Sequence, residues 1–201
     1  MWLNIIYSTV MIANWIINVI GIVLFLFLFW KKLKEDYSSN IIFGFSFFIL
    51  LGAGLGFLAS KYFFPHWFFW FEAFGAFLGF TVGIIKYNTR FFETYEALFI
   101  SFMPWLALFF LTREIYISVF ILGLIVLSVY LKAKYKTFLW YKSGKVGLVG
   151  LLISEAFFLS RAVVALLFPS VVSFLGLSDI VLSGVCVFTI FLLIYNLSKD
   201  D

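Results

Sequence analysis

The chain has 201 residues, of which 65% are hydrophobic and 12% charged, and its formal net charge is +4. A soluble domain cannot hide that much apolar surface, so this composition excludes one. Several apolar runs approach the about 20 residues that are needed to cross a hydrocarbon core of about 30 Å. We therefore predict an all-α polytopic membrane protein, with residues 1–201 forming a single transmembrane helical domain.

Seven membrane-spanning helices are predicted in chain order. They cover approximately residues 10–30, 41–60, 67–85, 95–111, 114–131, 146–168 and 179–197. Polar or proline-containing segments separate them. The break between the fourth and fifth helices is the shortest, because only Thr112, Arg113 and Glu114 interrupt the apolar pattern there.

The distribution of basic residues predicts the orientation in the membrane, because cytoplasmic loops are enriched in Lys and Arg. One side of the predicted bundle carries eleven basic residues, namely Lys31, Lys32, Lys34, Lys86, Arg90, Lys132, Lys134, Lys136, Lys142, Lys145 and Lys199. The other side carries only Lys61 and Arg113. We expect the N-terminus outside, the C-terminus in the cytoplasm and the chain in the cell membrane. The positive charge is then explained by basic residues that set the membrane orientation and lie next to anionic lipid headgroups. It does not require a nucleic-acid partner.

Small residues recur every four positions in the second and third predicted helices. The second has Gly52, Gly56 and Ser60, and the third has Gly75, Gly79 and Gly83. Small residues at this spacing let two helix backbones approach closely. The pattern predicts tight packing of these two helices rather than a direct role in ligand binding.

Five of the polar side chains inside the predicted spans are considered as site candidates, because an ionisable group there is a candidate functional site by default. With the expected orientation, Asn14, Asn18, Glu72 and Arg161 lie in the outer half of the membrane, and Glu155 lies near its middle. Glu155 and Arg161 are six residues apart, so they point about 120° away from each other on one helix. Each of them therefore needs another partner, water or a change of protonation.

Three interpretations of Arg161 are compatible with the sequence. Its guanidinium could extend to the outer membrane surface, pair with Glu72 and so join the third and sixth helices, or line a polar cavity and bind a lipid phosphate. Glu155 could be neutral, because burial disfavours a charged carboxylate. No recognisable metal-ligand spacing or cofactor-binding motif occurs, so no metal and no cofactor is predicted. Cys186 is the single cysteine, which excludes an intramolecular disulfide.

The order of several short segments resembles the prolipoprotein diacylglyceryl transferase family, whose members have seven spans, an external N-terminus and an arginine in the sixth helix. The matching segments are "ILLGAGLGF", "FGAFLG", "TRFFETYEALFISFMP", "TREIYIS", "SGKVGLVGLLISEAFFLSRAV" and "LGLSDIVLS". They extend over most of the chain. Arg161 falls at the family's helix-six arginine, Glu96 at an aspartate and Tyr116 at a tyrosine. Phe74 stands where the family has a histidine, and Gly54 where it has an arginine.

The resemblance implies transfer of diacylglycerol from a phosphatidylglycerol-like phospholipid to the cysteine of a preprolipoprotein lipobox. Arg161, Glu72 and Glu155 are then the candidate catalytic residues, with Arg161 on the lipid phosphate and a glutamate as proton acceptor. Candidate lipid-binding residues are Asn14, Asn18, Arg113 and Tyr116. The alternative is a catalytically inactive relative that binds lipid or partner helices in the membrane.

Overall fold

The computed structural model describes residues 2–111, 114–138, 146–167 and 176–198, with side chains from residue 15 onward. The long helices of these segments are α1 (Trp2–Leu33), α2 (Ser39–Phe63), α3 (Phe68–Tyr87), α4 (Phe91–Leu111), α5 (Ile115–Lys134), α6 (Leu148–Leu167) and α7 (Leu177–Ser198). Two short 3₁₀ turns, η1 (Pro65–Trp67) and η2 (Tyr135–Thr137), follow α2 and α5. The prediction of an all-α chain with seven long apolar helices is confirmed.

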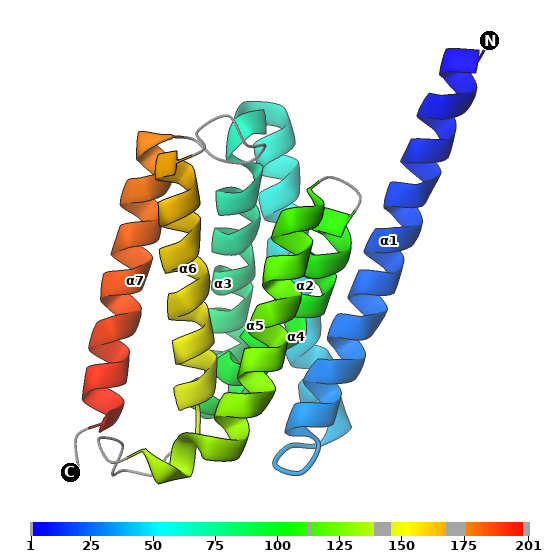
Figure 1. The fold of residues 1–201 in the computed structure, drawn as a ribbon. Coiled ribbons are helices and arrows are strands. Elements are labelled where there is room, and N and C mark those ends of the chain that lie inside the picture. The colour runs from blue at the N-terminus through cyan, green and yellow to red at the C-terminus, as the bar shows by residue number, and fades with distance from the viewer. Residues whose placement is uncertain (1, 112–113, 139–145, 168–175, 199–201) are drawn as a thin grey trace.

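The helices alternate in direction and form a bundle with two distinct ends (Figure 1). The η1 end holds η1 and the starts of α1, α3, α5 and α7. The lysine end holds the opposite ends of the helices and eight basic residues, Lys31, Lys32, Lys34, Lys86, Arg90, Lys132, Lys134 and Lys136. Each of the seven helices contains a stretch that is long and apolar enough to cross a membrane. The chain is therefore a multi-pass membrane protein.

The first helix is the element that differs most from its predicted bounds. It starts at Trp2 rather than near residue 10 and has 32 residues. At about 1.5 Å per residue such a helix is longer than the hydrocarbon core is thick. Its first turns extend past the rest of the bundle at the η1 end (Figure 1). Within the part of α1 whose side chains the structure describes, residues Trp15–Leu33 are apolar enough to cross a membrane.

The predicted close packing of the second and third helices is confirmed. A Cβ atom added at Gly52 would fall on the carbonyl oxygen of Gly75, and one added at Gly79 would fall on the carbonyl oxygen of Phe48. The same holds for Gly56 against Phe71. Because these glycines have no side chain, the backbones of α2 and α3 touch directly.

Aromatic side chains fill much of the interior of the bundle. Phe25 and Phe29 of α1 pack with Phe45 of α2 and Phe80 of α3, and all four are fully buried. A second cluster joins α4, α5 and α6, and a third joins α6 to α7. The outer faces carry exposed apolar residues such as Phe188, which is 64% exposed outside a membrane. These faces suit lipid contact, as expected for a helix bundle in a bilayer.

Candidate functional site

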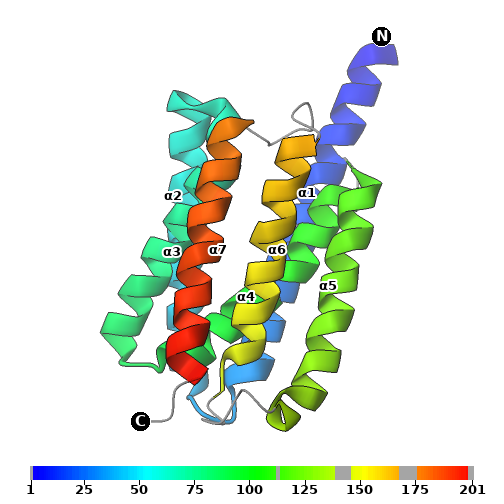
Figure 2. The ribbon, with the colours of Figure 1, turned by 60° about the vertical axis from the view of Figure 1, so that its left-hand side comes forward.

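Arg161 lies on the buried face of α6, which the view in Figure 2 places beside α7. It is six residues before the last residue of α6, so it lies about 9 Å below the η1 end of that helix. The residue is only 5% exposed. Its side chain is therefore enclosed by the bundle rather than extended to the membrane surface.

The guanidinium of Arg161 forms a buried ion pair with Asp179 of α7. Nη2 donates a hydrogen bond of 3.0 Å and Nε one of 3.2 Å, both to Oδ1 of Asp179. The side chain of Asp179 is fully buried and that of Arg161 is 4% exposed. Hydrogen bonds between two charged groups are among the strongest in proteins, and this one joins α6 to α7 inside the apolar region.

A third helix closes the site, because Trp70 of α3 donates a hydrogen bond from its indole nitrogen to the same oxygen of Asp179. Oδ1 of Asp179 thus accepts three hydrogen bonds from two side chains. Sequence analysis did not assign Trp70 to this cluster. Its indole ring stacks on Phe158 of α6 at a centroid distance of 6.1 Å. Trp70 therefore fixes the carboxylate and also packs α3 against α6.

Aromatic rings cover the positive side of the ion pair. Cζ of Arg161 lies 3.8 Å from the ring centroid of Phe69 and 5.5 Å from that of Trp70. The negative face of an aromatic ring attracts a guanidinium, and the attraction strengthens where water is excluded. We call Arg161, Asp179, Trp70 and Phe69 the arginine cluster.

Local sequence explains why Asp179 reaches this position. Gly176 has φ +57° and directly precedes α7, and Asp179 is the third residue of that helix. A carboxylate in the first turn is stabilised by the unpaired N–H groups and the positive end of the helix dipole. The start of α7 and the end of α6 both lie at the η1 end, so Asp179 and Arg161 meet at similar depth.

Asp179 was not among the site residues predicted from the sequence, although the sequence contains a signal for it. The segment "LGLSDIVLS" places an acidic residue at the start of the last predicted helix. That start is on the same side of the membrane as the end of the preceding helix, where Arg161 lies. An opposite charge at matching depth on consecutive helices would have made Asp179 a candidate partner.

The two candidate catalytic glutamates are half-buried. Glu72 lies on α3, two residues beyond Trp70, and takes part in an interaction. Glu155 lies on α6 and, within the part of the chain that the structure describes, forms no hydrogen bond or ion pair. The different surroundings of Glu155 and Arg161 agree with the angular separation expected on one helix.

The candidate lipid-binding residues do not gather around Arg161. Asn18 of α1 accepts a hydrogen bond of 3.2 Å from the indole nitrogen of Trp105 on α4, and so ties these two helices together. Tyr116 of α5 is 85% exposed and lies on the outer surface of the bundle. The side chain of Asn14 and all of Arg113 lie outside the described residues, as do Lys142, Lys145 and Lys199.

A second buried charged group lies at the lysine end. Oε1 of Glu96 on α4 is 3.6 Å from Nζ of Lys32 on α1, and Oε2 accepts a hydrogen bond of 3.3 Å from the backbone N–H of Gly150 on α6. Glu96 thus binds one of the N–H groups that the first turn of a helix leaves unpaired. We interpret this group as a structural link among α1, α4 and α6.

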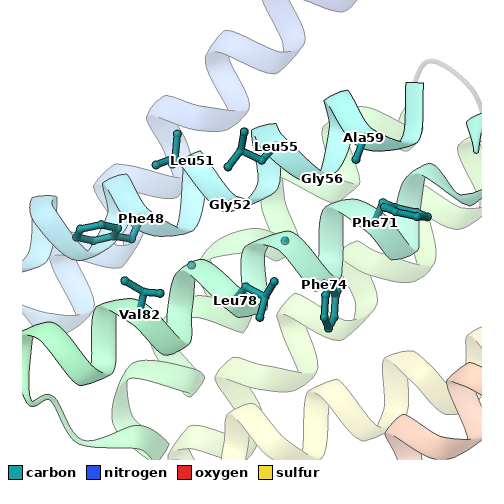
Figure 3. Close-up of a pocket in the computed structure, with 12 residues that line it drawn as sticks. Phe48, Leu51, Gly52, Leu55, Gly56, Ala59, Phe71, Phe74, Leu78 and Val82 are labelled. Carbon is teal, nitrogen blue, oxygen red and sulfur yellow. The ribbon is translucent and has the colours of Figure 1, made fainter. Parts of the chain in front are cut away.

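An apolar groove of about 350 Å³ runs between α2 and α3 (Figure 3). Its lining consists only of Phe, Leu, Val, Ala and Gly residues, including Phe74, Leu78 and Leu55. Such a surface suits an acyl chain but offers no side chain that could orient a phosphate. Phe74, which stands at the family's histidine position, is 63% exposed along this groove.

The arginine cluster is suited to recognise a polar or anionic group inside the membrane, since it combines a guanidinium, a carboxylate and a hydrogen-bonding indole. Among the described residues there is no group of three or more His, Cys, Asp and Glu side chains that could hold a metal ion. Comparisons with protein-family models, curated proteins and solved structures found no match to this chain.

Proposed function

We propose that this protein is a phospholipid-processing membrane transferase that acts like a prolipoprotein diacylglyceryl transferase. The observation that carries the proposal is the arginine cluster, in which Arg161 of the sixth helix is buried with polar partners near one end of the bundle. Asp179 accepts two hydrogen bonds from the Arg161 guanidinium. In the proposed complex, the positive charge of Arg161 attracts a lipid phosphate.

In the proposed orientation, the bundle spans the plasma or inner membrane of the cell. The lysine end faces the cytoplasm. Eight of the described basic residues lie at that end, and Lys61 lies at the η1 end. The positive-inside rule favours this direction. The arginine cluster then lies in the outer half of the membrane, where a phosphatidylglycerol-like lipid and the lipobox of a preprolipoprotein would meet.

The proposed reaction breaks the bond between the glyceryl carbon and the phosphate oxygen of the lipid and forms a bond between that carbon and a cysteine sulfur. The cysteine loses its proton and glycerol phosphate leaves. Arg161 would stabilise the negative charge of the departing phosphate. A carboxylate must receive the thiol proton. Glu72 and Glu155 are the candidates from sequence, and Asp179 is the carboxylate in contact with Arg161.

The test is to incubate the purified protein in phosphatidylglycerol vesicles with a lipobox peptide and to measure the mass of the peptide. We expect the mass of one diacylglyceryl group to be added, and we expect Arg161→Ala to abolish the addition. Arg90→Ala is the matched control, because the Arg90 side chain is 76% exposed at the lysine end and pairs with nearby Glu93. A fully active Arg161→Ala variant would refute the role of Arg161.

The second candidate function is a catalytically inactive relative that binds lipid or a partner helix. Two observations favour it: Asp179 neutralises Arg161, and Phe74 replaces the family's histidine beside an apolar groove. The same experiment separates the two functions. A folded protein that adds nothing to the peptide, yet keeps phosphatidylglycerol bound through purification, supports the inactive relative.

A further inference from the structure

Two fully buried polar atoms of α7 have no hydrogen-bond partner among the residues that the structure describes. They are Oδ2 of Asp179 and Oγ of Ser183, and both residues are 0% exposed. Residues four apart lie one above the other on a helix, with their Cβ atoms about 5–6 Å apart. The two atoms therefore line the same buried face of α7, next to the arginine cluster.

Leaving a polar group buried without a partner costs about 1–3 kcal/mol. Several described serines inside helices avoid that cost by donating to a carbonyl of the preceding turn, although buried Ser101 of α4 does not. Ser46 donates to Ile42, Ser154 to Leu151 and Ser160 to Phe157, at 2.8, 2.9 and 2.8 Å. The Ser183 hydroxyl has no such bond. The Ser183 hydroxyl can therefore form a hydrogen bond with a group outside α7.

The charges around these atoms select the kind of ligand. Arg161 and Trp70 already hold the other oxygen of Asp179, so the carboxylate is oriented and its charge is balanced. A phosphate would be repelled by Oδ2, and a second cation would be repelled by the nearby guanidinium. A neutral O–H group can donate to Oδ2 and accept from the Ser183 hydroxyl, which satisfies both atoms.

We infer that Asp179 Oδ2 and Ser183 Oγ form a buried binding site for one neutral hydroxyl group. The source is either a water molecule or a hydroxyl of a lipid headgroup such as glycerol. A buried water typically makes about three hydrogen bonds, so one water molecule has the capacity to pair with both atoms. A headgroup hydroxyl would use the same two atoms while its phosphate reaches Arg161. The site does not depend on transfer activity.

The experiment is to determine the structure of the full chain in nanodiscs of two lipids, at a resolution that shows ordered water. Phosphatidylglycerol carries headgroup hydroxyls, and phosphatidylmethanol has the same charge but none. We expect density that bridges Asp179 Oδ2 and Ser183 Oγ. Density in both lipids identifies water, and density continuous with the headgroup in phosphatidylglycerol alone identifies the lipid hydroxyl.

Two variants make the result specific. Ser183→Ala should remove the bridging density, whereas Ser46→Ala should leave it, because Ser46 is equally buried but bonds to its own helix. No density in either lipid, with the Ser183 hydroxyl turned onto the carbonyl of Asp179, would overturn the inference. Density that persists in Ser183→Ala would also overturn it. The experiment measures whether the site between Asp179 and Ser183 is occupied. Its result therefore does not depend on whether the protein has transferase activity.

Discussion

At the scale of single residues, the arginine cluster shows how a charge is kept inside an apolar bundle. Neither Arg161 nor Asp179 is more than 5% exposed, so neither is solvated by water at the surface. Each charge instead has the other as partner, with Trp70 and Phe69 as additional contacts. A buried ion pair adds little net stability compared with well-packed apolar residues. The pair is therefore weak evidence for added stability, and its position inside the apolar region marks it as a candidate functional site.

Substitutions of the two charged residues test the pairing directly. Asp179→Leu should lower the free energy of unfolding by about 3–5 kcal/mol, because it leaves the Arg161 charge buried without its partner. The double variant Arg161→Met, Asp179→Leu should recover most of that loss while remaining unable to bind or process phospholipid. Equilibrium unfolding in detergent measures the first effect, and the peptide mass assay measures the second. A double variant with the summed loss of both single variants would contradict a direct interaction.

At the scale of helices, α2 and α3 form the most closely packed pair, and glycine is the reason. The backbone of each helix occupies the space where the other would place a Cβ atom. The sequence pattern of Gly52, Gly56, Gly75 and Gly79 anticipated this contact, because four-residue spacing puts small side chains on one face. The resulting groove is apolar and lies away from the charged side chains of the arginine cluster.

Two alanine substitutions in α2 separate packing from helix propensity. Gly52→Ala should lower the unfolding free energy by about 1–3 kcal/mol, because the new methyl group would overlap the carbonyl of Gly75. Gly54→Ala is the control, since a Cβ atom there meets no atom within 4 Å. It should be neutral or slightly stabilising, because alanine favours helices by about 1 kcal/mol over glycine. Equal effects of the two variants would contradict the close contact.

At the scale of the whole molecule, the basic residues are distributed unequally between the two ends of the bundle. The lysine end carries eight described basic residues, whereas the η1 end carries Lys61, in the last turn of α2. Exposed apolar residues cover the sides between these ends. This distribution predicts one orientation in the membrane, with the arginine cluster toward the outside.

Thiol labelling of intact cells measures the orientation. In a Cys186→Ser background, His66→Cys at the η1 end should react with a reagent that cannot cross membranes. Ser38→Cys at the lysine end should react only after the cells are opened. Both positions are exposed. The opposite labelling pattern would place the arginine cluster in the inner leaflet and would exclude an encounter with an exported lipobox there.

The amino-acid sequence by itself determined the fold class, the number of spans and the close pairing of α2 and α3. These features follow from hydrophobic run length and from the spacing of small residues, both of which are local along the chain. It also identified Arg161 as the basic side chain inside a span. The start of α1 was missed, because helix propensity continues beyond the stretch that hydropathy assigns to the membrane.

The tertiary structure alone decided which residues meet. It selected Asp179 as a partner of Arg161, added Trp70 and Phe69, and placed Asn18 against Trp105 and Tyr116 on the outer surface. The partners in the arginine cluster lie on three different helices, up to 109 positions apart in sequence. Contacts over such separations depend on how the helices rotate and pack against one another, and hydrophobic periodicity does not specify that rotation to a single residue.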